Sequence, residues 1–538
     1  MKFLTNPSNP YTISRKPLYA KNGMVATSQP LAAQAGLSIL QKGGNAIDAA
    51  IATAACLTVV EPTTNGIGGD AFALVWTKGE LHGLNGSGKS PQSISIDALK
   101  EKGHETMPTY GWIPVTVPGA PGAWAELSDR FGVLPFEELL EPAISYAEEG
   151  FPVSPTIAKF WKKAFVKYEA AKEKLPELSE WFTVFAPDGR APKVGEIWSS
   201  PRHAATLREI AETTSASFYH GALAQKMVRA SKEAGGFLSH EDLAAYRPEW
   251  VDPIHARYHG YDVWEIPPNG QGIVALEALG LLDEYTFSSK GNVELYHKQI
   301  EAIKLAFSDA KQYVTEEIHM PFPSANLLDP AYLDKRRELI SEYAQIPEAG
   351  EPFGSGTVYL ATADKDGNMV SLIQSNYMGF GSGVVVPGTG IAMQNRGHDF
   401  SLDETHVNAL AGGKKTFHTI IPGFLTKDGQ PVGPFGVMGG AMQPQAHVQV
   451  VSNTVDFHLN PQAALDAPRW QWLKDKTVSV ENTFPHYLAE ELAEKGHEIQ
   501  IEVENNSFGR GQIIWRDPET GVLVGGTESR TDGSIVGW

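Results

Sequence analysis

Two apolar runs rich in β-branched residues lie on either side of residue 366 and have the pattern of a β-hairpin. The first covers residues 357–363 and the second covers residues 369–374, and a polar turn with Asp, Gly and Asn separates them. Turn-forming residues between two such runs are typical of a hairpin. The preceding stretch, residues 346–356, contains Pro and Gly and ends in Gly-Ser-Gly. We therefore expect an exposed linker that leads into a first strand at Thr357.

Hydrophobic periodicity predicts strands towards both ends of the chain and mostly helices between residues 132 and 350. Residues 46–60 are Ala-rich and apolar nearly all round, which is typical of a buried helix. Further helices are expected at residues 30–42, 123–131, 135–149, 203–213, 223–234, 295–314, 330–345, 444–455, 461–466 and 487–495. Strands are expected at residues 24–28, 71–76, 81–84, 261–266, 391–394, 420–425 and 435–440. This order predicts an α+β protein in which mixed sheet is packed between helices.

Composition and charge narrow the class of protein. The chain has 538 residues, 42% hydrophobic residues, 53 Gly and 36 Pro, which indicates a globular, loop-rich protein. Its length alone suggests about two to four domains. The formal charge of −19 argues against a nucleic-acid surface, because binding phosphates needs concentrated Lys and Arg. The same charge argues weakly against anionic membranes.

The remaining sequence features predict a cytoplasmic, soluble protein without a cofactor. Cys56 is the only cysteine and lies in an apolar run, so we expect packing and no intrachain disulfide. Residues 1–22 lack the apolar region of a secretion signal, and no 18-residue apolar window predicts a membrane helix. The 16 histidines are scattered and form no metal-binding motif, so no metal is expected.

Residues 83–90, Gly-Leu-Asn-Gly-Ser-Gly-Lys-Ser, match the phosphate-binding pattern G-x-x-x-x-G-K-S. That pattern needs a helix that begins at Gly-Lys-Ser, so that backbone N–H groups face the phosphates. Pro91 follows directly, and a residue before proline avoids the α region. A nucleotide site is therefore disfavoured. The alternatives are a glycine-rich loop that lines another site and a plain turn.

Thr357 has a second possible role as a chain terminus. If the bond between Gly356 and Thr357 breaks, the Thr357 hydroxyl lies beside a free α-amine. An α-amine has a pKa of roughly 7.7–8, so near neutral pH it can act as the base for that hydroxyl. The residues around Thr357 thus suggest a self-activating nucleophile.

An ordered series of short motifs covers nearly the whole chain. It comprises residues 43–50, 61–62, 66–69 with Phe72, 117–119, 267–269, 272–273, 301–309, 366–368, 379–383, 399–401, 439–440 and 467–469. In this order the motifs resemble the γ-glutamyltransferase (glutathione hydrolase) family, which includes the class IV cephalosporin acylases. Each motif is weak by itself, whereas the ordered set is highly specific.

The resemblance implies an N-terminal-nucleophile hydrolase with an αββα sandwich. Its precursor would cut itself between Gly356 and Thr357. The products would be a large subunit, residues 1–356, with the N-terminal part of the sandwich and the helical region, and a small subunit, residues 357–538. The two would stay associated, either alone or in a higher oligomer. Thr357 would then attack a small-molecule amide, and the acyl group would pass to water or to an amino-acid or peptide acceptor.

The resemblance also implies roles for residues of the site. Gly439 and Gly440 match the family's oxyanion donors, although two glycines are also compatible with a plain turn. Ser375 matches a hydroxyl residue that hydrogen-bonds the nucleophile. Asp399 matches the carboxylate that holds the α-ammonium of a γ-glutamyl group, and its structural alternative is an acid in a surface turn.

Several positions depart from the family pattern, and most of them concern the acyl group. The departures are Val358-Tyr359 in place of Thr-His, Ser87 in place of a carboxylate-binding Arg with Lys89 nearby, Tyr377 in place of Asn, Arg396 in place of Gln, and His418-Thr419 in place of Ser-Ser. Losing an Arg–carboxylate fork removes a strong and specific contact. Lys89 or Arg396 could supply the missing charge. The segment between residues 400 and 416 is also short, so the site is expected to be open.

Together these patterns predict a self-processing Thr amidohydrolase that acts on γ-glutamyl, glutathione-like or glutaryl amides, with weak classical transpeptidation. One alternative is an acylase with specificity for a different side chain. Another is a catalytically weak or inactive relative that only binds a metabolite. The third, a nucleotide-binding protein, is the least favoured.

Overall fold

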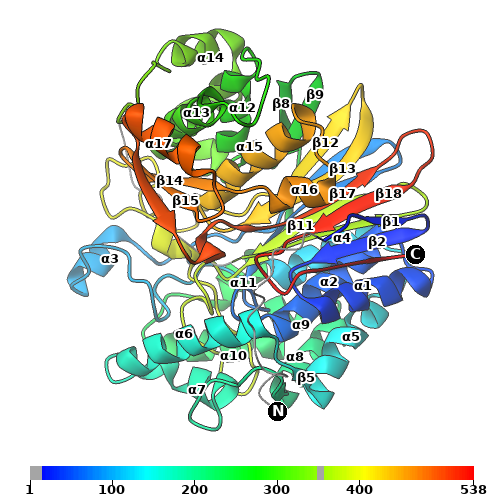
Figure 1. The fold of residues 1–538 in the computed structure, drawn as a ribbon. Helices are drawn as coiled ribbons and strands as arrows, with labels where there is room; N and C mark the ends of the chain where they lie inside the picture. The colour runs from blue at the N-terminus through cyan, green and yellow to red at the C-terminus, as the bar shows by residue number, and fades with distance from the viewer. Residues whose placement is uncertain (1–14, 348–356) are drawn as a thin grey trace.

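The computed structural model describes residues 15–347 and 357–538. Within these residues, two seven-stranded sheets pack face to face, and helices cover both outer faces (Figure 1). Helices α1 (Pro30–Gln41) and α2 (Ala46–Val60) lie on one sheet, and α12 (Gly272–Leu282) and α15 (Met442–Val455) lie on the other. The layers therefore follow the order α, β, β, α, which confirms the αββα sandwich that the sequence analysis expected.

The first sheet has the order β19-β2-β10-β11-β3-β4-β7, and its neighbouring strands are antiparallel. Its strands are β2 (Gly23–Thr27), β3 (Asp70–Thr77), β4 (Glu80–Asn85), β7 (Glu249–Val251), β10 (Val358–Asp364), β11 (Met369–Ser375) and β19 (Ser534–Gly537). The second sheet has the order β1-β18-β17-β13-β12-β9-β8. Its strands are β1 (Leu18–Ala20), β8 (Ile254–Tyr258), β9 (Tyr261–Glu265), β12 (Gly423–Lys427), β13 (Gln430–Met438), β17 (Arg510–Arg516) and β18 (Leu523–Thr527).

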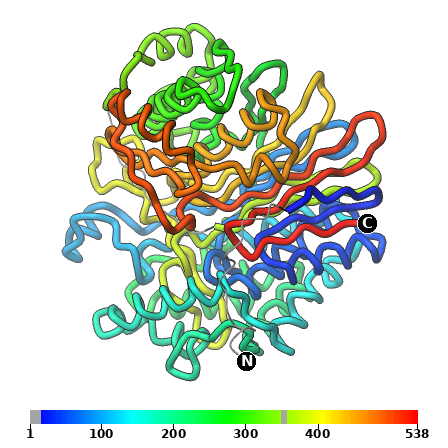
Figure 2. The backbone as a smooth tube through the Cα atoms, viewed as in Figure 1, coloured from blue at the N-terminus to red at the C-terminus, as the bar shows by residue number. Residues whose placement is uncertain are grey.

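Both large sheets combine strands from before and after Thr357. In the first sheet, β10 lies between β2 and β11, and β11 pairs with β3. In the second sheet, β1 pairs with β18, and β9 pairs with β12. Figure 2 shows blue N-terminal and red C-terminal strands side by side. The two halves of the chain are therefore held together by backbone hydrogen bonds in both sheets.

The three largest apolar cores join the four layers. The inner core, between the sheets, includes Phe72, Leu74, Tyr359 and Phe424. Each outer core joins one sheet to its helices. Every residue of α2 (Ala46–Val60) is buried, as its Ala-rich sequence predicts, and Asn45 begins it with a capping box.

Most helices agree with the periodicity of the sequence. The longer ones are α1 (Pro30–Gln41), α4 (Ala120–Phe131), α5 (Phe136–Glu149), α6 (Pro155–Ala171), α8 (Pro201–Glu212), α10 (Ala222–Glu233), α12 (Gly272–Leu282), α13 (Val293–Tyr313), α14 (Pro330–Arg337), α15 (Met442–Val455) and α17 (His486–Glu494). The shorter ones include α3 (Ile96–Glu101), α7 (Ser179–Phe185), α9 (Ala216–His220), α11 (His240–Ala245) and α16 (Pro461–Asp466). No helix within the described residues is both long and apolar enough to cross a membrane.

The structure corrects two local expectations from the sequence and confirms a third. The helix expected over residues 330–345 ends at Arg337, because residues after it turn to contact α13 and the C-terminal half. The strand expected at 391–394 is wrong, since only isolated bridges form there. The next helix after residues 83–90 begins at Ile96, so the backbone has no phosphate-binding helix start at Lys89.

Two small sheets complete the fold. One contains β14 (Trp470–Lys474), β15 (Thr477–Glu481) and β16 (Glu498–Glu502), and the other pairs β5 (Phe151–Pro152) with β6 (Ile197–Trp198). Between β14 and β18, a buried ionic network crosses the C-terminal half. Glu528 accepts hydrogen bonds from Arg469 and Arg530, each at 2.8 Å, and Arg530 also binds Glu481.

Glu528→Gln should lower the free energy of unfolding at pH 7 by about 3–5 kcal/mol, because two buried guanidinium groups lose their shared carboxylate. Burial alone would oppose ionisation, but Arg469 and Arg530 hold the pKa of Glu528 at about 2, below its ordinary value of 4.5. The stabilisation from this carboxylate is therefore full above pH 4.5 and is lost as pH falls towards 2. Urea unfolding of both proteins at pH 7 and pH 4 measures the effect. The exposed Glu490→Gln is the control, and an equal loss in both variants would contradict the role of the network.

Candidate active site

Thr357 is buried directly before β10, at the end of the first sheet. Its Oγ1 lies 3.1 Å from Oγ of Ser375, the last residue of β11. Oγ of Ser375 also accepts a hydrogen bond from the N–H of Tyr377, at 2.8 Å. The structure thus brings together two residues that the sequence analysis selected as nucleophile and partner. Gly356, the other side of the expected cleavage point, lies outside the described residues.

The unusual residue Tyr359 belongs to the inner core. Its ring is buried between the sheets, and its hydroxyl lies 2.7 Å from Oγ of Ser371. The ring packs against Gly436, where an added Cβ would lie 2.5 Å from a ring carbon. Tyr359 therefore fills space between the sheets, and its departure from the family pattern is matched by a glycine on the facing strand.

Gly439 and Gly440 form the turn between β13 and the start of α15. Both have positive φ angles, 146° and 61°, which favour glycine. The carbonyl of Gly440 accepts a hydrogen bond from Nε2 of Gln271 at 2.8 Å, which fixes the orientation of this turn. A backbone turn at a helix N-terminus presents N–H groups that can stabilise a developing negative charge. The geometry is compatible with the oxyanion role that the resemblance implied.

Arg396 is the centre of a buried cluster. It lies in a short 3₁₀ helix with Asp399, and its Nη1 donates to Oδ2 of Asp399 at 3.0 Å and to Oγ1 of Thr419 at 2.9 Å. Its guanidinium stacks on the ring of Tyr377, 4.0 Å from the ring centroid. Tyr377 donates from its hydroxyl to Oδ1 of Asp399 at 2.5 Å. Four residues selected from the sequence therefore meet in one place.

Two donors of Arg396 remain without a partner among the described residues. They are Nε and Nη2, and both are buried. These two groups form the side edge of the guanidinium, which matches the two oxygens of a carboxylate. A buried donor without an acceptor costs free energy, so these two groups are available to a ligand or to an ordered water. By contrast, both oxygens of Asp399 already accept hydrogen bonds from the protein.

Tyr377 adds backbone strain to this cluster. Its φ angle is 73°, a left-handed conformation that a bulky side chain rarely adopts. The N–H bond to Ser375 and the stacking on Arg396 hold Tyr377 in this conformation. Such strain is typical of functional sites.

His418 forms a buried pair with Asp70, the first residue of β3. Nε2 of His418 donates to Oδ2 of Asp70 at 3.1 Å. Burial, together with Arg396 and Lys415, keeps the pKa of His418 well below its ordinary value, so the imidazole is neutral. The sequence analysis did not select Asp70. The available signal was an acid at the point where the glycine-rich stretch before it becomes an apolar strand.

The partners of Ser87 and Lys89 are residues outside the Arg396 cluster. Oγ of Ser87 donates to Oδ1 of Asn85 at 2.7 Å, and Nδ2 of Asn269 approaches the same hydroxyl at 3.3 Å. Lys89 is half-exposed and pairs with Glu316 at 3.4 Å. Ser87 and Lys89 both line a cavity of about 470 Å³. The glycine-rich loop therefore borders a cavity. Of the two candidates for the missing positive charge, Arg396 is the one that is buried next to Asp399.

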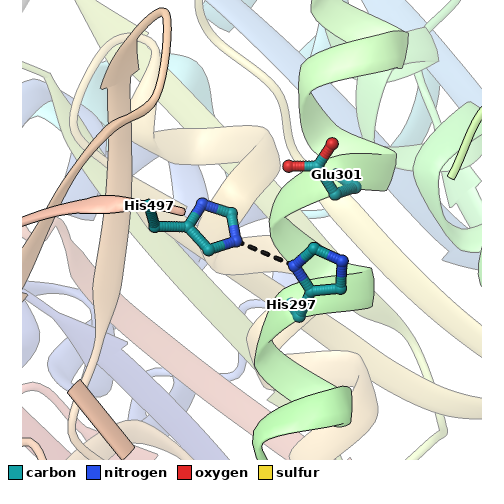
Figure 3. A group of neighbouring side chains, drawn as sticks. All are labelled: His297, Glu301 and His497. Carbon is teal, nitrogen blue, oxygen red and sulfur yellow. Dashed lines mark hydrogen bonds between the residues drawn. The ribbon is translucent and has the colours of Figure 1, made fainter. Parts of the chain in front are cut away.

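A second cluster, of side chains that could bind a metal ion, lies where α13 meets the turn before β16. It contains His297, Glu301 and His497, whose ligand atoms all lie within 4.8 Å of one another (Figure 3). Nε2 of His297 donates to the Ser341 carbonyl at 3.0 Å, so its Nδ1 accepts from Nε2 of His497 at 2.9 Å. Lys304 donates to Glu301 at 2.7 Å.

Electrostatics disfavour a metal ion in this second cluster. Burial and the neighbouring Lys304, His297, Lys476 and Lys495 lower the pKa of His497 to about 2. The three lysines among these neighbours oppose a divalent cation, and Glu301 already neutralises Lys304. The other oxygen of Glu301 accepts from the N–H of Gln345 at 3.1 Å. We therefore assign this cluster a structural role, in which it ties residues 341–345 and the C-terminal half to α13.

Comparisons with known proteins match nearly the whole chain. The family model described as gamma-glutamyltranspeptidase matches residues 32–538. The glutathione hydrolase-like YwrD proenzyme of Bacillus subtilis is 38% identical and covers 96% of this chain and 98% of its own length. The oxamate amidohydrolase proenzyme of Klebsiella pneumoniae is 33% identical, with coverages of 96% and 98%.

A solved structure is closer still. The crystal structure of a cephalosporin acylase from Bacillus halodurans is 63% identical to this chain, with a TM-score of 0.96 and 99% coverage of both chains. At this identity and coverage, the two proteins share the N-terminal-nucleophile sandwich along the whole length described.

Proposed function

The chain belongs to the gamma-glutamyltranspeptidase family, and on this premise we propose that it is a self-processing amidohydrolase with Thr357 as its nucleophile. The assignment of the substrate rests on the buried side chain of Arg396, whose Nε and Nη2 groups have no hydrogen-bond acceptor among the described residues. The relatives named above, two of them proenzymes, include hydrolases and an acylase, which supports a reaction at an amide bond.

Processing would begin at the bond between Gly356 and Thr357. Oγ1 of Thr357 attacks the Gly356 carbonyl carbon, a C–O bond forms, the C–N bond breaks, and the hydroxyl proton passes to the released amine. Water then hydrolyses this ester, which leaves a carboxylate on Gly356 and a free hydroxyl and α-amine on Thr357. The products are residues 1–356 and residues 357–538. Because they share both large sheets, we expect them to remain associated.

The mature Thr357 would then act on the substrate. Its α-amine takes the hydroxyl proton as Oγ1 attacks the substrate carbonyl, and Ser375 orients this hydroxyl from 3.1 Å. The N–H groups around Gly439 and Gly440 stabilise the oxyanion. The amine part of the substrate leaves with this proton, and water or an acceptor amine then releases the acyl group from the Thr357 ester.

Arg396 defines the acyl group. Its free edge, Nε and Nη2, fits a carboxylate as a two-pronged, charge-assisted hydrogen bond. Asp399, which holds an α-ammonium in the family pattern, is bound here by Tyr377 and Arg396. The site therefore favours an acyl group with a carboxylate and without an α-ammonium, as in a glutaryl amide, over a γ-glutamyl group. The name of the Klebsiella relative also denotes the amide of a dicarboxylic acid.

A panel of p-nitroanilides tests this proposal. We expect the processed protein to hydrolyse glutaryl p-nitroanilide with a kcat/KM at least about tenfold above that of γ-glutamyl p-nitroanilide, and further above that of butyryl p-nitroanilide. A preference for γ-glutamyl would overturn the assignment of the acyl group. Binding of glutarate with no turnover of any anilide would favour the metabolite-binding alternative.

A further inference from the structure

Asp70 lies in one row with the proposed nucleophile and its partner. In the first sheet, Asp70 of β3 is directly opposite Ser375 of β11. Residues opposite one another in an antiparallel pair point to the same face, with Cβ atoms about 5 Å apart. Ser375 in turn lies 3.1 Å from Thr357. Phe72 and Tyr359, two residues further along their strands, are in the inner core, so this row faces the space between the sheets.

The carboxylate of Asp70 is only half satisfied. The N–H of Ile420 donates to Nδ1 of His418, so the imidazole proton is on Nε2 and is donated to Oδ2 of Asp70. Oδ1 of Asp70 is buried and has no hydrogen-bond partner among the described residues. This oxygen is an unpartnered polar atom in the same site as the unpartnered edge of Arg396.

Burial raises the pKa of Asp70 to about 7, against the opposing effect of nearby positive groups, of which Arg396 has the largest and Lys415 a smaller effect. The backbone N–H groups of Gly88 and Gly119 face the carboxylate and act in the same direction, without reaching Oδ1 in hydrogen-bonding geometry. The other titratable groups that face Asp70 among the described residues are His418, Tyr219 and Tyr246, and processing would add the α-amine of Thr357 to the same row. Asp70 thus changes charge close to neutral pH while Arg396 favours its ionised form.

We infer that Asp70 is a specificity residue of this site, which accepts an anionic acyl group on Arg396 only while Asp70 carries a proton. This inference rests on the proposed function. A carboxylate on Arg396 would neutralise the cation that most favours ionised Asp70. Ionised Asp70 would then be a second buried anion beside the first, which is costly. The substrate and one proton therefore bind together, and each raises the affinity for the other.

Binding measurements test this coupling without catalysis. Glutarate is titrated into the processed protein at pH 7.5 in two buffers with different ionisation enthalpies, and the calorimetric difference gives the protons taken up. We expect about half a proton more to be taken up per glutarate in the wild type than in Asp70→Asn, in which the Thr357 α-amine still titrates. The control is Asp48→Asn, because Asp48 is another buried acid with a raised pKa and lies in the cap of α2. Equal uptake in the wild type and Asp70→Asn would overturn the inference.

Kinetics test the same point and separate it from the proposed function. The ratio of kcat/KM for glutaryl and butyryl p-nitroanilide cancels the titration of the Thr357 amine. This ratio should fall about tenfold per pH unit above about pH 7 in the wild type, and should be flat in Asp70→Asn. If the wild type hydrolyses neither anilide, the proposed function fails. If it hydrolyses both at a ratio that is constant with pH, the function stands and the role of Asp70 fails, even where Asp70→Asn does not fold.

Discussion

Thr357→Ala should leave the chain in one piece. We expect the wild type to give two bands of about 39 and 20 kDa on a denaturing gel, because residues 1–356 and 357–538 divide a total of 58.4 kDa. The variant should give one band of the full mass, since no hydroxyl is present to attack the preceding carbonyl. Its activity on glutaryl p-nitroanilide should fall by at least about 10⁴-fold, because nucleophile and base are lost together.

Two further variants show whether this loss is chemical. Thr357→Ser keeps a hydroxyl and an α-amine, so it should still be processed, at a lower rate. Thr362→Ala removes another buried threonine of β10, whose Oγ1 donates to the Ala46 carbonyl at 2.7 Å, and should be processed as the wild type is. Cleavage of Thr357→Ala at the wild-type rate would show that a different residue attacks. A single band for the wild type itself would contradict self-processing.

Local patterns were sufficient to predict the elements that carry this nucleophile. The hairpin of β10 and β11 follows from two β-branched runs and an Asp-Gly-Asn turn, and its register places Ser375 beside Thr357. The buried α2 follows from its Ala-rich, uniformly apolar sequence. Arg396 and Asp399 are three residues apart, so a single helical turn is enough to bring them together.

Non-local pairing explains what the sequence did not show. Asp70 reaches the site because β3 pairs with β11, and nothing near Asp70 in the sequence indicates a partner about 300 residues later. The helical middle of the chain also supplies β7 and β8, which the sequence analysis did not expect, to the edges of the large sheets, where short strands have weak periodicity. The family motifs placed Ser87 at a lost arginine, but only the folded chain shows that Arg396 has an open edge for a carboxylate.

Arg396→Gln should separate recognition of the acyl group from the chemical step. The variant loses the charged fork, so kcat/KM for glutaryl p-nitroanilide should fall about 10²-fold, in line with about 3 kcal/mol for two charge-assisted hydrogen bonds. Most of the change should be in KM if the fork binds substrate and transition state equally. Hydrolysis of butyryl p-nitroanilide should change little, because that substrate has no carboxylate for Arg396.

The same substitution frees Asp399 from its ion pair with Arg396. We therefore expect Arg396→Gln to shift preference towards γ-glutamyl p-nitroanilide, whose ammonium can then reach Asp399. Arg396→Lys should lie between the two, since it keeps the charge without the planar fork. Arg130→Gln is the matched control, because Arg130 also stacks on an aromatic ring, 4.1 Å from the centroid of Trp250. An equal loss of kcat/KM on all three anilides in Arg396→Gln would show that Arg396 only maintains the structure of the site. Other residues would then have to select the acyl group.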